Sequence, residues 1–163
     1  MLKFQSYSIL FLGVLFWNCS HKRDSDAKLD PLHHTRNVVV LSVQETRFVA
    51  PDTASKYQVV TFTSSFNEWS FLNLAWEEGK VDFPEVEYIF YYSGNDTVGL
   101  KNWMEQKLFA YPILHDYKGE FRRENIKGEL TNISFVVKDG GKVALSNPGL
   151  PDFKDILKGM ISK

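Results

Sequence analysis

The sequence predicts an α/β fold in which a central mixed sheet is flanked by helices, with an N-terminal β extension. Short runs rich in β-branched and aromatic residues, at 58–63 and 86–92, each precede a segment with helical apolar spacing. Near the end of the chain, Asp139-Gly140-Gly141 separates two apolar runs, which is typical of an antiparallel hairpin. Strand–helix alternation implies parallel pairing, and the hairpin adds antiparallel strands.

The chain has the size and composition of one globular domain. Its 163 residues are 44% hydrophobic and 24% charged, and a chain of this length buries enough surface to need no disulfide or metal. The only cysteine is Cys19, and the formal net charge is −1. Because nucleic acid is bound by strongly basic surfaces, we expect no nucleic-acid partner.

A helix is expected directly after the run at 58–63. Ser65 and Glu68 have the spacing of a capping box, in which a hydroxyl and a carboxylate satisfy amides of the first turn. The helix is expected over 65–78, with Gly79 ending it. Its apolar face would carry three residues at helical spacing, Trp69, Leu72 and Trp76.

Two further helices are expected. Asp96 offers an N-cap to a helix whose apolar residues are Leu100, Trp103, Met104 and Leu108. Residues 111–114 are expected to be extended, and the charged stretch 115–130 to hold one helical turn. The last helix is amphipathic, with apolar residues at Phe153, Ile156, Leu157, Met160 and Ile161.

The N-terminus has the features of an export signal. Lys3 precedes an apolar run at 8–17, which is too short to span a bilayer and fits a signal peptide over 1–18. Cys19 follows and resembles the acylated cysteine of bacterial lipoproteins. We therefore expect a lipid on Cys19 to anchor the chain in the bacterial cell envelope, at the outer membrane, facing the periplasm or the cell surface.

Two segments are expected between the anchor and the compact domain. Residues 19–36 are polar and aperiodic, which predicts a lipidated tether without core contacts. Residues 37–56 form the N-terminal β extension, with a strand at 38–43 that pairs with 47–49. The compact domain is then expected over 57–163.

Two runs in this domain carry a family resemblance. Residues 61–76 read Thr-Phe-Thr-Ser-Ser-Phe-Asn-Glu-Trp-Ser-Phe-Leu-Asn-Leu-Ala-Trp, and residues 132–143 read Asn-Ile-Ser-Phe-Val-Val-Lys-Asp-Gly-Gly-Lys-Val. They resemble the Cys-x-x-Cys helix start and the cis-proline strand of thioredoxin-like proteins of the peroxiredoxin and envelope-thioredoxin kind. In this register Phe66 and Trp69 stand at the cysteine positions and Asn132 at the cis-proline position. The resemblance implies a thioredoxin-like fold over 57–163.

The missing cysteines remove the chemistry of that family. Thiol-disulfide exchange needs a thiolate at a helix N-terminus and a second thiol that resolves the mixed disulfide. Phe66 and Trp69 supply neither, and an acylated Cys19 leaves no free thiol. We therefore expect no catalytic residues, no cofactor and no thiol-based enzyme activity.

Two interpretations of these vestigial positions remain open. Phe66 and Trp69 either form a hydrophobic plug or form, with Asn132 and Ile133, an apolar groove for an extended partner segment, since the family resemblance implies strand addition at this surface. Asn132 is expected to be trans, because a cis bond before a residue other than proline is costly.

Three functions follow from these interpretations. The predicted function is a lipid-anchored, redox-inactive protein that binds a protein or peptide partner. The alternative is a thioredoxin-like oxidoreductase or antioxidant protein that uses non-standard chemistry, such as that of an unlipidated Cys19. A purely structural spacer also fits.

Histidine chemistry is not favoured. His33 and His34 point apart in an extended chain and lie with His21 in the expected tether, so no metal site is predicted. His115-Asp116 with a nearby serine could suggest a hydrolase, but the sequence has no G-x-S-x-G elbow.

Overall fold

The computed structural model describes residues 29–43 and 50–162. The expected signal peptide, Cys19, the first part of the expected tether and the expected strand at 47–49 lie outside these residues. Within the described ranges no helix is long and apolar enough to cross a membrane.

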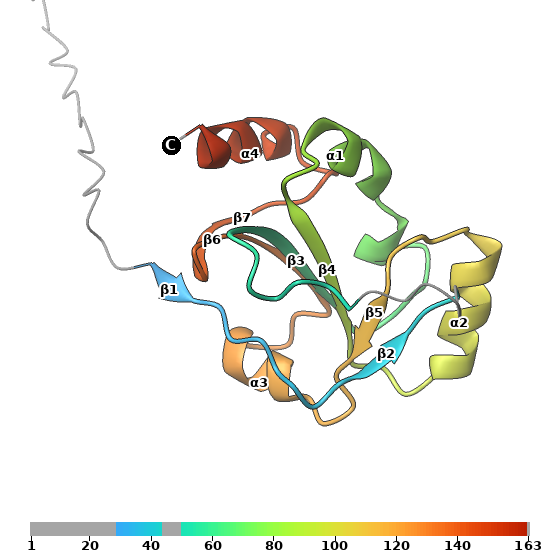
Figure 1. Cartoon of the computed structure of the whole chain (residues 1–163). Coiled ribbons are helices and arrows are strands. Elements are labelled where there is room, and N and C mark those ends of the chain that lie inside the picture. The colour runs from blue at the N-terminus through green and yellow to red at the C-terminus, as the bar shows by residue number, and fades with distance from the viewer. Residues whose placement is uncertain (1–28, 44–49, 163) are drawn as a thin grey trace, which may run out of the picture.

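The described strands form one mixed sheet in the order β1-β7-β6-β3-β4-β5-β2 (Figure 1). Its parallel centre consists of β3 (Tyr57–Thr63), β4 (Glu87–Tyr92) and β5 (Ile113–His115). The hairpin of β6 (Asn132–Lys138) and β7 (Gly141–Leu145) lies on the other side of β3 and pairs antiparallel with it through β6. The predicted mixed sheet and closing hairpin are confirmed.

Helices cover both faces of this sheet. α1 (Trp76–Asp82), α2 (Thr97–Gln106) and α4 (Phe153–Ile161) contribute to one apolar layer, and α3 (Glu120–Asn125) to the other (Figure 1). Because α1 and α2 both connect neighbouring parallel strands in the same direction along the sheet, right-handed crossovers place them on the same face.

The predictions for α2 and α4 are largely confirmed. Asp96 caps α2 and accepts a hydrogen bond from the amide of Gly99 at 2.8 Å. Leu108 departs from the prediction, since it follows α2 with φ of 52° and its side chain is 85% exposed. In α4 the buried residues follow the predicted spacing: Phe153, Leu157 and Met160.

The predicted start of the helix expected over 65–78 is wrong. A loop follows β3, then a single 3₁₀ turn, η1 (Phe71–Asn73), and α1 begins only at Trp76. Asn67 holds the loop, because its side-chain oxygen accepts the amide of Trp69 at 3.1 Å and its carbonyl accepts the amide of Ser70 at 2.9 Å. Ser70, and not Ser65, then caps the first turn.

Gly79 lies inside α1 and does not end it. A Cβ at this position would come within 2.8 Å of Tyr88 Oη, so the glycine permits α1 to pack closely on β4. The hydroxyl of Tyr88 is buried and has no hydrogen-bond partner among the described residues. Its burial raises the pKa of Tyr88 well above the ordinary value.

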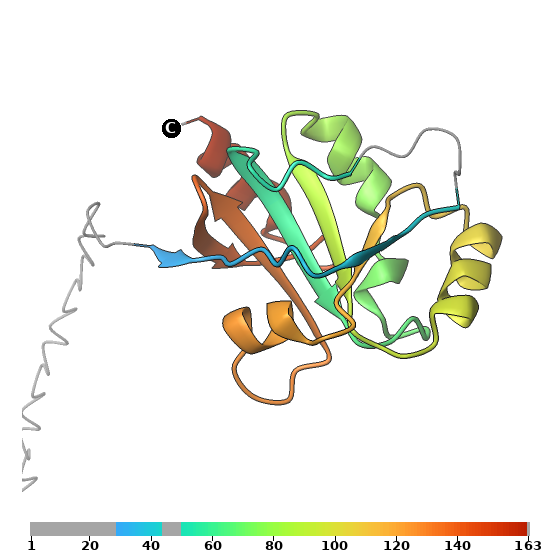
Figure 2. The same ribbon diagram turned by 60° about the horizontal axis from the view of Figure 1, so that its bottom comes forward.

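The face of the sheet that α3 covers is completed by residues 30–41, which we call the strap. Its first residues form β1 (Asp30–Pro31) against β7 at one edge, and its last residues form β2 (Val39–Leu41) against β5 at the opposite edge. Between them the strap crosses the sheet (Figure 2). One segment therefore pairs with both outer strands.

The tether expected over 19–36 was predicted to lack core contacts. For residues 30–36, which belong to the strap, that prediction is wrong. Leu32 is only 8% exposed and packs in the same apolar layer as α3. The amide of His33 donates to Asn125 Oδ1 at 2.8 Å, and Asn125 Nδ2 donates to the His33 carbonyl at 2.7 Å. The strand expected at 38–43 is present as β2, and β5 is its partner.

Tyr88→Phe is expected to raise the free energy of unfolding by about 1 kcal/mol, because it removes a buried hydroxyl that makes no hydrogen bond. Tyr91→Phe is the matched control on the same strand. Its hydroxyl lies 3.1 Å from His34 Nδ1, so its loss is expected to cost about 1 kcal/mol. Urea unfolding measures both changes, and equal destabilisation by the two variants would contradict the assignment.

Candidate functional site

The candidate site lies where the central strand β3 ends. In open α/β sheets, ligands bind beyond the carboxyl ends of parallel strands, at the point where the order of connections reverses. Here β3 leads through α1 to β4 on one side and is flanked on the other side by β6, which comes much later in the chain. That point is Thr63, which pairs with Asn132.

A cluster of polar side chains shapes this end of the sheet, with Thr63 and Ser70 buried and Asn132 half-buried. Thr63 Oγ1 donates to Asn132 Oδ1 at 2.7 Å and lies 3.2 Å from Ser70 Oγ. The amide of Phe71 also donates to Asn132 Oδ1, at 3.2 Å. The carboxamide of Asn132 therefore ties the loop after β3 to the start of β6.

The backbone around Asn132 is regular. The amide of Ser64 donates to the carbonyl of Thr131 at 2.9 Å, which extends the pairing of β3 and β6 past Thr63. The described residues contain no cis peptide bond, in agreement with the trans bond expected at Asn132. The loop before β6 is therefore joined to β3 through its backbone.

Phe66 and Trp69 have different environments within the loop. Phe66 is half-buried and packs against the core, with its ring centroid 6.2 Å from that of Tyr92. Trp69 is 79% exposed. The family register implied that both residues lie in the first turn of a helix. The structure places both before that turn, because Ser70 caps η1 and follows them in the chain. A hydrophobic plug describes the position of Phe66 but not that of Trp69.

The cavity beside η1 and α1 is not lined by the four predicted groove residues. A cavity of about 250 Å³ lies between the η1–α1 segment and the connection from α2 to β5, and its lining includes Leu72, Trp76, Trp103 and Leu108 but none of the four. Ile133, on β6, packs into the apolar layer beneath the strap. The structure thus joins Asn132 to the loop that carries Phe66 and Trp69 and leaves Ile133 in the core.

The pair that suggested a hydrolase has other partners. His115 Nε2 lies 2.9 Å from the carbonyl of Gly94. Asp116 is buried, and its carboxylate accepts the amides of Glu120 at 2.8 Å and Arg122 at 3.2 Å, which places it at the start of α3. The polar atoms of both side chains are therefore engaged with the backbone.

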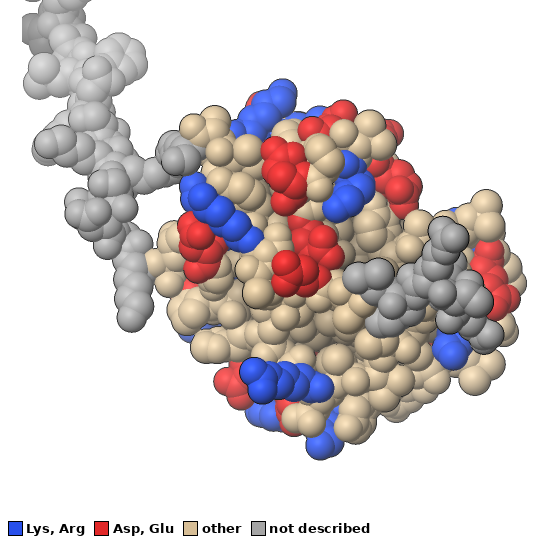
Figure 3. Space-filling view, in the orientation of Figure 1, with Lys and Arg blue, Asp and Glu red and all other residues tan. Residues whose placement is uncertain are grey.

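The charged side chains give no single-signed surface on the face drawn in Figure 3, where acidic and basic residues are interspersed. Across the described ranges no group of three histidine, cysteine, aspartate or glutamate residues could hold a metal ion.

The architecture is a thioredoxin-like α/β fold. No family model and no curated protein matches the chain in sequence. A thiol:disulfide interchange protein of the thioredoxin family from Chlorobium tepidum has a similar structure, with a TM-score of 0.55 and 18% identity over 84% of this chain and 99% of that chain.

Two further solved structures resemble the chain. An uncharacterized conserved protein from Geobacillus kaustophilus gives a TM-score of 0.52 at 16% identity, over 66% of this chain and 68% of that chain. StoA from Bacillus subtilis gives 0.51 at 11% identity, over 66% of this chain and 84% of that chain. At such identities the likeness establishes the fold alone.

The sequence did not indicate the roles of Thr63 and Ser70. Thr63 meets Asn132 across 69 positions of sequence, and no local pattern marks such a pair. A signal for Ser70 was present, because a serine before a short apolar run is a helix-cap pattern, but Ser65 offered the same pattern earlier.

Asn132→Ala is expected to lower the free energy of unfolding by about 1 kcal/mol, since the amide of Phe71 loses its acceptor, whereas the Thr63 hydroxyl keeps the carbonyl of Ser65 at 2.6 Å. Hydrogen exchange at the Phe71 amide is expected to accelerate. Asn132→Asp keeps an oxygen acceptor and is expected to retain most of the protection. Unchanged exchange in Asn132→Ala would contradict the role of the carboxamide.

Proposed function

We propose that this chain is a binding protein whose thioredoxin-like domain is redox-inactive, and that a lipid on Cys19 anchors it in the bacterial cell envelope. Its partner is a protein or peptide that presents an extended segment to the end of β3. The observation that carries the proposal is the exposed indole of Trp69, which lies in a loop that hydrogen bonds to Asn67 hold in place.

Trp69 has the properties of a residue that anchors a partner. Tryptophan buries a large apolar area and is enriched among the residues that dominate interface energies. The hydrogen bonds of Asn67 to the amides of Trp69 and Ser70 order the backbone on both sides of the indole. An ordered backbone lowers the entropy that binding must remove, which favours affinity.

The absence of thiols favours binding over exchange chemistry. Residues 20–163 contain no cysteine, so this part of the chain can form neither a thiolate nor a mixed disulfide. A thioredoxin-like domain of this composition keeps the fold without the nucleophile. The polar cluster of Thr63, Ser70 and Asn132 supports the loop in its place.

The anchor would hold the domain close to the membrane. Cys19 precedes β1 by eleven residues, which span at most about 36–40 Å when fully extended. A partner within the envelope would therefore be met near the lipid surface.

Trp69→Ala is expected to reduce capture of a partner polypeptide from envelope extracts at least tenfold, about the loss of one dominant interface residue. The full chain is immobilised for this measurement, and unfolding in urea checks that stability is unchanged. Val81→Ala is the matched control, because Val81 on α1 is 80% exposed and lies outside the site. Equal capture by Trp69→Ala and the control would refute the role of Trp69.

The full chain is expected to show no turnover in an insulin-reduction assay, and mass spectrometry of its mature N-terminus is expected to find an acylated Cys19. The resemblance to a thiol:disulfide interchange protein is the observation that favours the alternative, a thioredoxin-like oxidoreductase with non-standard chemistry. Turnover by a form with a free Cys19 would establish that alternative and overturn the proposal.

A further inference from the structure

His34 links the middle of the strap to two central strands of the sheet. Its Nδ1 lies 3.1 Å from Tyr91 Oη on β4, and its Nε2 lies 2.9 Å from Gln58 Oε1 on β3. The imidazole also stacks on the ring of Tyr91, with centroids 6.1 Å apart and an interplanar angle of 27°. The ring of His34 thus makes polar contacts with both β3 and β4, which the strap crosses at this point.

The partners of His34 fix the direction of one of its two hydrogen bonds. Gln58 uses its Nε2 to donate to the carbonyls of Thr53 at 3.0 Å and Ser55 at 2.8 Å, so its Oε1 faces His34 as an acceptor. His34 therefore donates through Nε2, and in the neutral ring Nδ1 accepts from the hydroxyl of Tyr91. A proton on Nδ1 reverses this second bond, so the Tyr91 hydroxyl becomes the acceptor, its own proton loses Nδ1 as a partner, and a charge is placed on a half-buried ring.

The charged groups around His34 do not replace that acceptor. A cavity of about 320 Å³ between the strap and α3 gives water access to the ring. Its charged or titratable lining residues, besides His34 itself, are His33 and Arg36 of the strap and Glu120, Arg123 and Glu124 of α3. Burial raises the pKa of the Tyr91 hydroxyl, and the negative charge of Asp116, which follows β5, raises it further. The Asp116 carboxylate accepts hydrogen bonds from two amides of α3. Burial is the dominant effect on the imidazole and lowers the pKa of His34.

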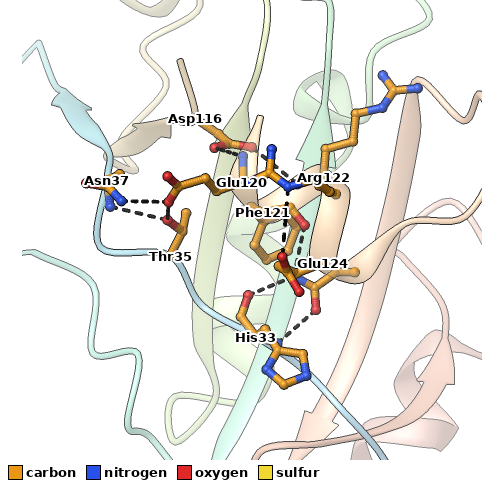
Figure 4. A network of polar contacts seen from close by, with 10 residues as sticks. His33, Thr35, Asn37, Asp116, Glu120, Phe121, Arg122 and Glu124 are labelled. Carbon is orange, nitrogen blue, oxygen red and sulfur yellow. Dashed lines mark hydrogen bonds and ion pairs between the residues drawn. The ribbon is translucent and has the colours of Figure 1, made fainter. Parts of the chain in front are cut away.

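The strap is also bound by the carboxylate of Glu120 on α3, which does not titrate near neutral pH. Glu120 Oε2 accepts hydrogen bonds from Thr35 Oγ1 and Asn37 Nδ2, both at 2.7 Å (Figure 4). These two bonds lower the pKa of Glu120 further below neutral. The ion pair of Lys142 with the exposed Asp30 contributes little to the stability of the docked strap.

We propose that the strap is a pH-controlled latch, in which protonation of His34 releases residues 30–41 from the sheet. Release uncovers the apolar layer that the strap covers together with α3, which includes Val60, Phe62, Tyr91 and Phe121. The docked strap holds the pKa of His34 below the ordinary 6.5 of the released ring, so docking is favoured above that pH and weakens as the pH falls below it.

The latch has a consequence that rests on the proposed anchor. Releasing the 12 residues of the strap adds up to about 40 Å to the reach between Cys19 and the domain. The domain would then extend farther from the membrane in acid. The latch itself requires neither the lipid nor binding at Trp69, so its failure would leave the proposed function untouched.

Hydrogen exchange of the full chain at pH 7.5 and pH 5.0, corrected for the intrinsic rate, tests the latch. Exchange in peptides that cover the strap is expected to be at least several-fold faster at pH 5.0, because the docked ring takes up a proton less readily than the released ring. Amides of β3, β4 and β6 are expected to stay protected. Equal strap protection at both pH values, or acceleration throughout the sheet, would overturn the proposal.

Two variants identify the group that titrates. His34→Gln keeps a neutral donor and acceptor and is expected to hold the strap equally at both pH values. His33→Gln is the matched control and is expected to keep the wild-type response, since its backbone and not its ring binds Asn125. A wild-type pH response in His34→Gln, or its loss in His33→Gln, would overturn the proposal.

A titration of the wild-type chain by NMR decides the outcome if His34→Gln leaves the strap unprotected at both pH values. The midpoint of the His34 ring is then expected to coincide with the midpoint of strap exchange. Midpoints that differ would overturn the proposal.

Discussion

The rest of the structure depends on the burial of β3 on both faces. Val59, Val60 and Phe62 are fully buried, so each face of the sheet needs its own covering layer. α1, α2 and α4 supply one layer, but α3 has only six residues and is about 9 Å long. The five strands outside the strap, β7-β6-β3-β4-β5, are about 19 Å across. The strap is therefore needed to complete the second layer.

The composition of the strap reflects its two surroundings. Leu32 packs into the apolar layer, as Val38 and Val40 do in part, whereas Thr35 and Asn37 bind the carboxylate of Glu120. This second set of contacts explains why the segment carries so many polar residues and yet lies against the sheet. In the proposed latch, the half-buried His34 couples the covering of the sheet to proton concentration.

The end of β3 combines a loop held by hydrogen bonds with one exposed aromatic side chain. A cluster of two buried hydroxyls and a half-buried carboxamide organises the loop, while the half-buried Phe66 contributes to the core. These groups form hydrogen bonds with one another and with the backbone and carry no thiol. What remains exposed is Trp69, whose indole suits it to recognition through apolar contact.

Local pattern alone determined β3, β4, the closing hairpin, α2 and α4, because continuous runs of β-branched and aromatic residues mark buried strands and a period of about 3.6 residues marks the buried side of a helix. The hairpin turn was equally local, since Asp139 and Gly140 take φ of 50° and 76°. Only the tertiary structure decided that Asn132 ties the loop after β3 to β6 and that the strap docks. Those features depend on hydrogen bonds between residues far apart, such as His33 with Asn125, 92 positions away, and such partners leave no periodic trace in the sequence.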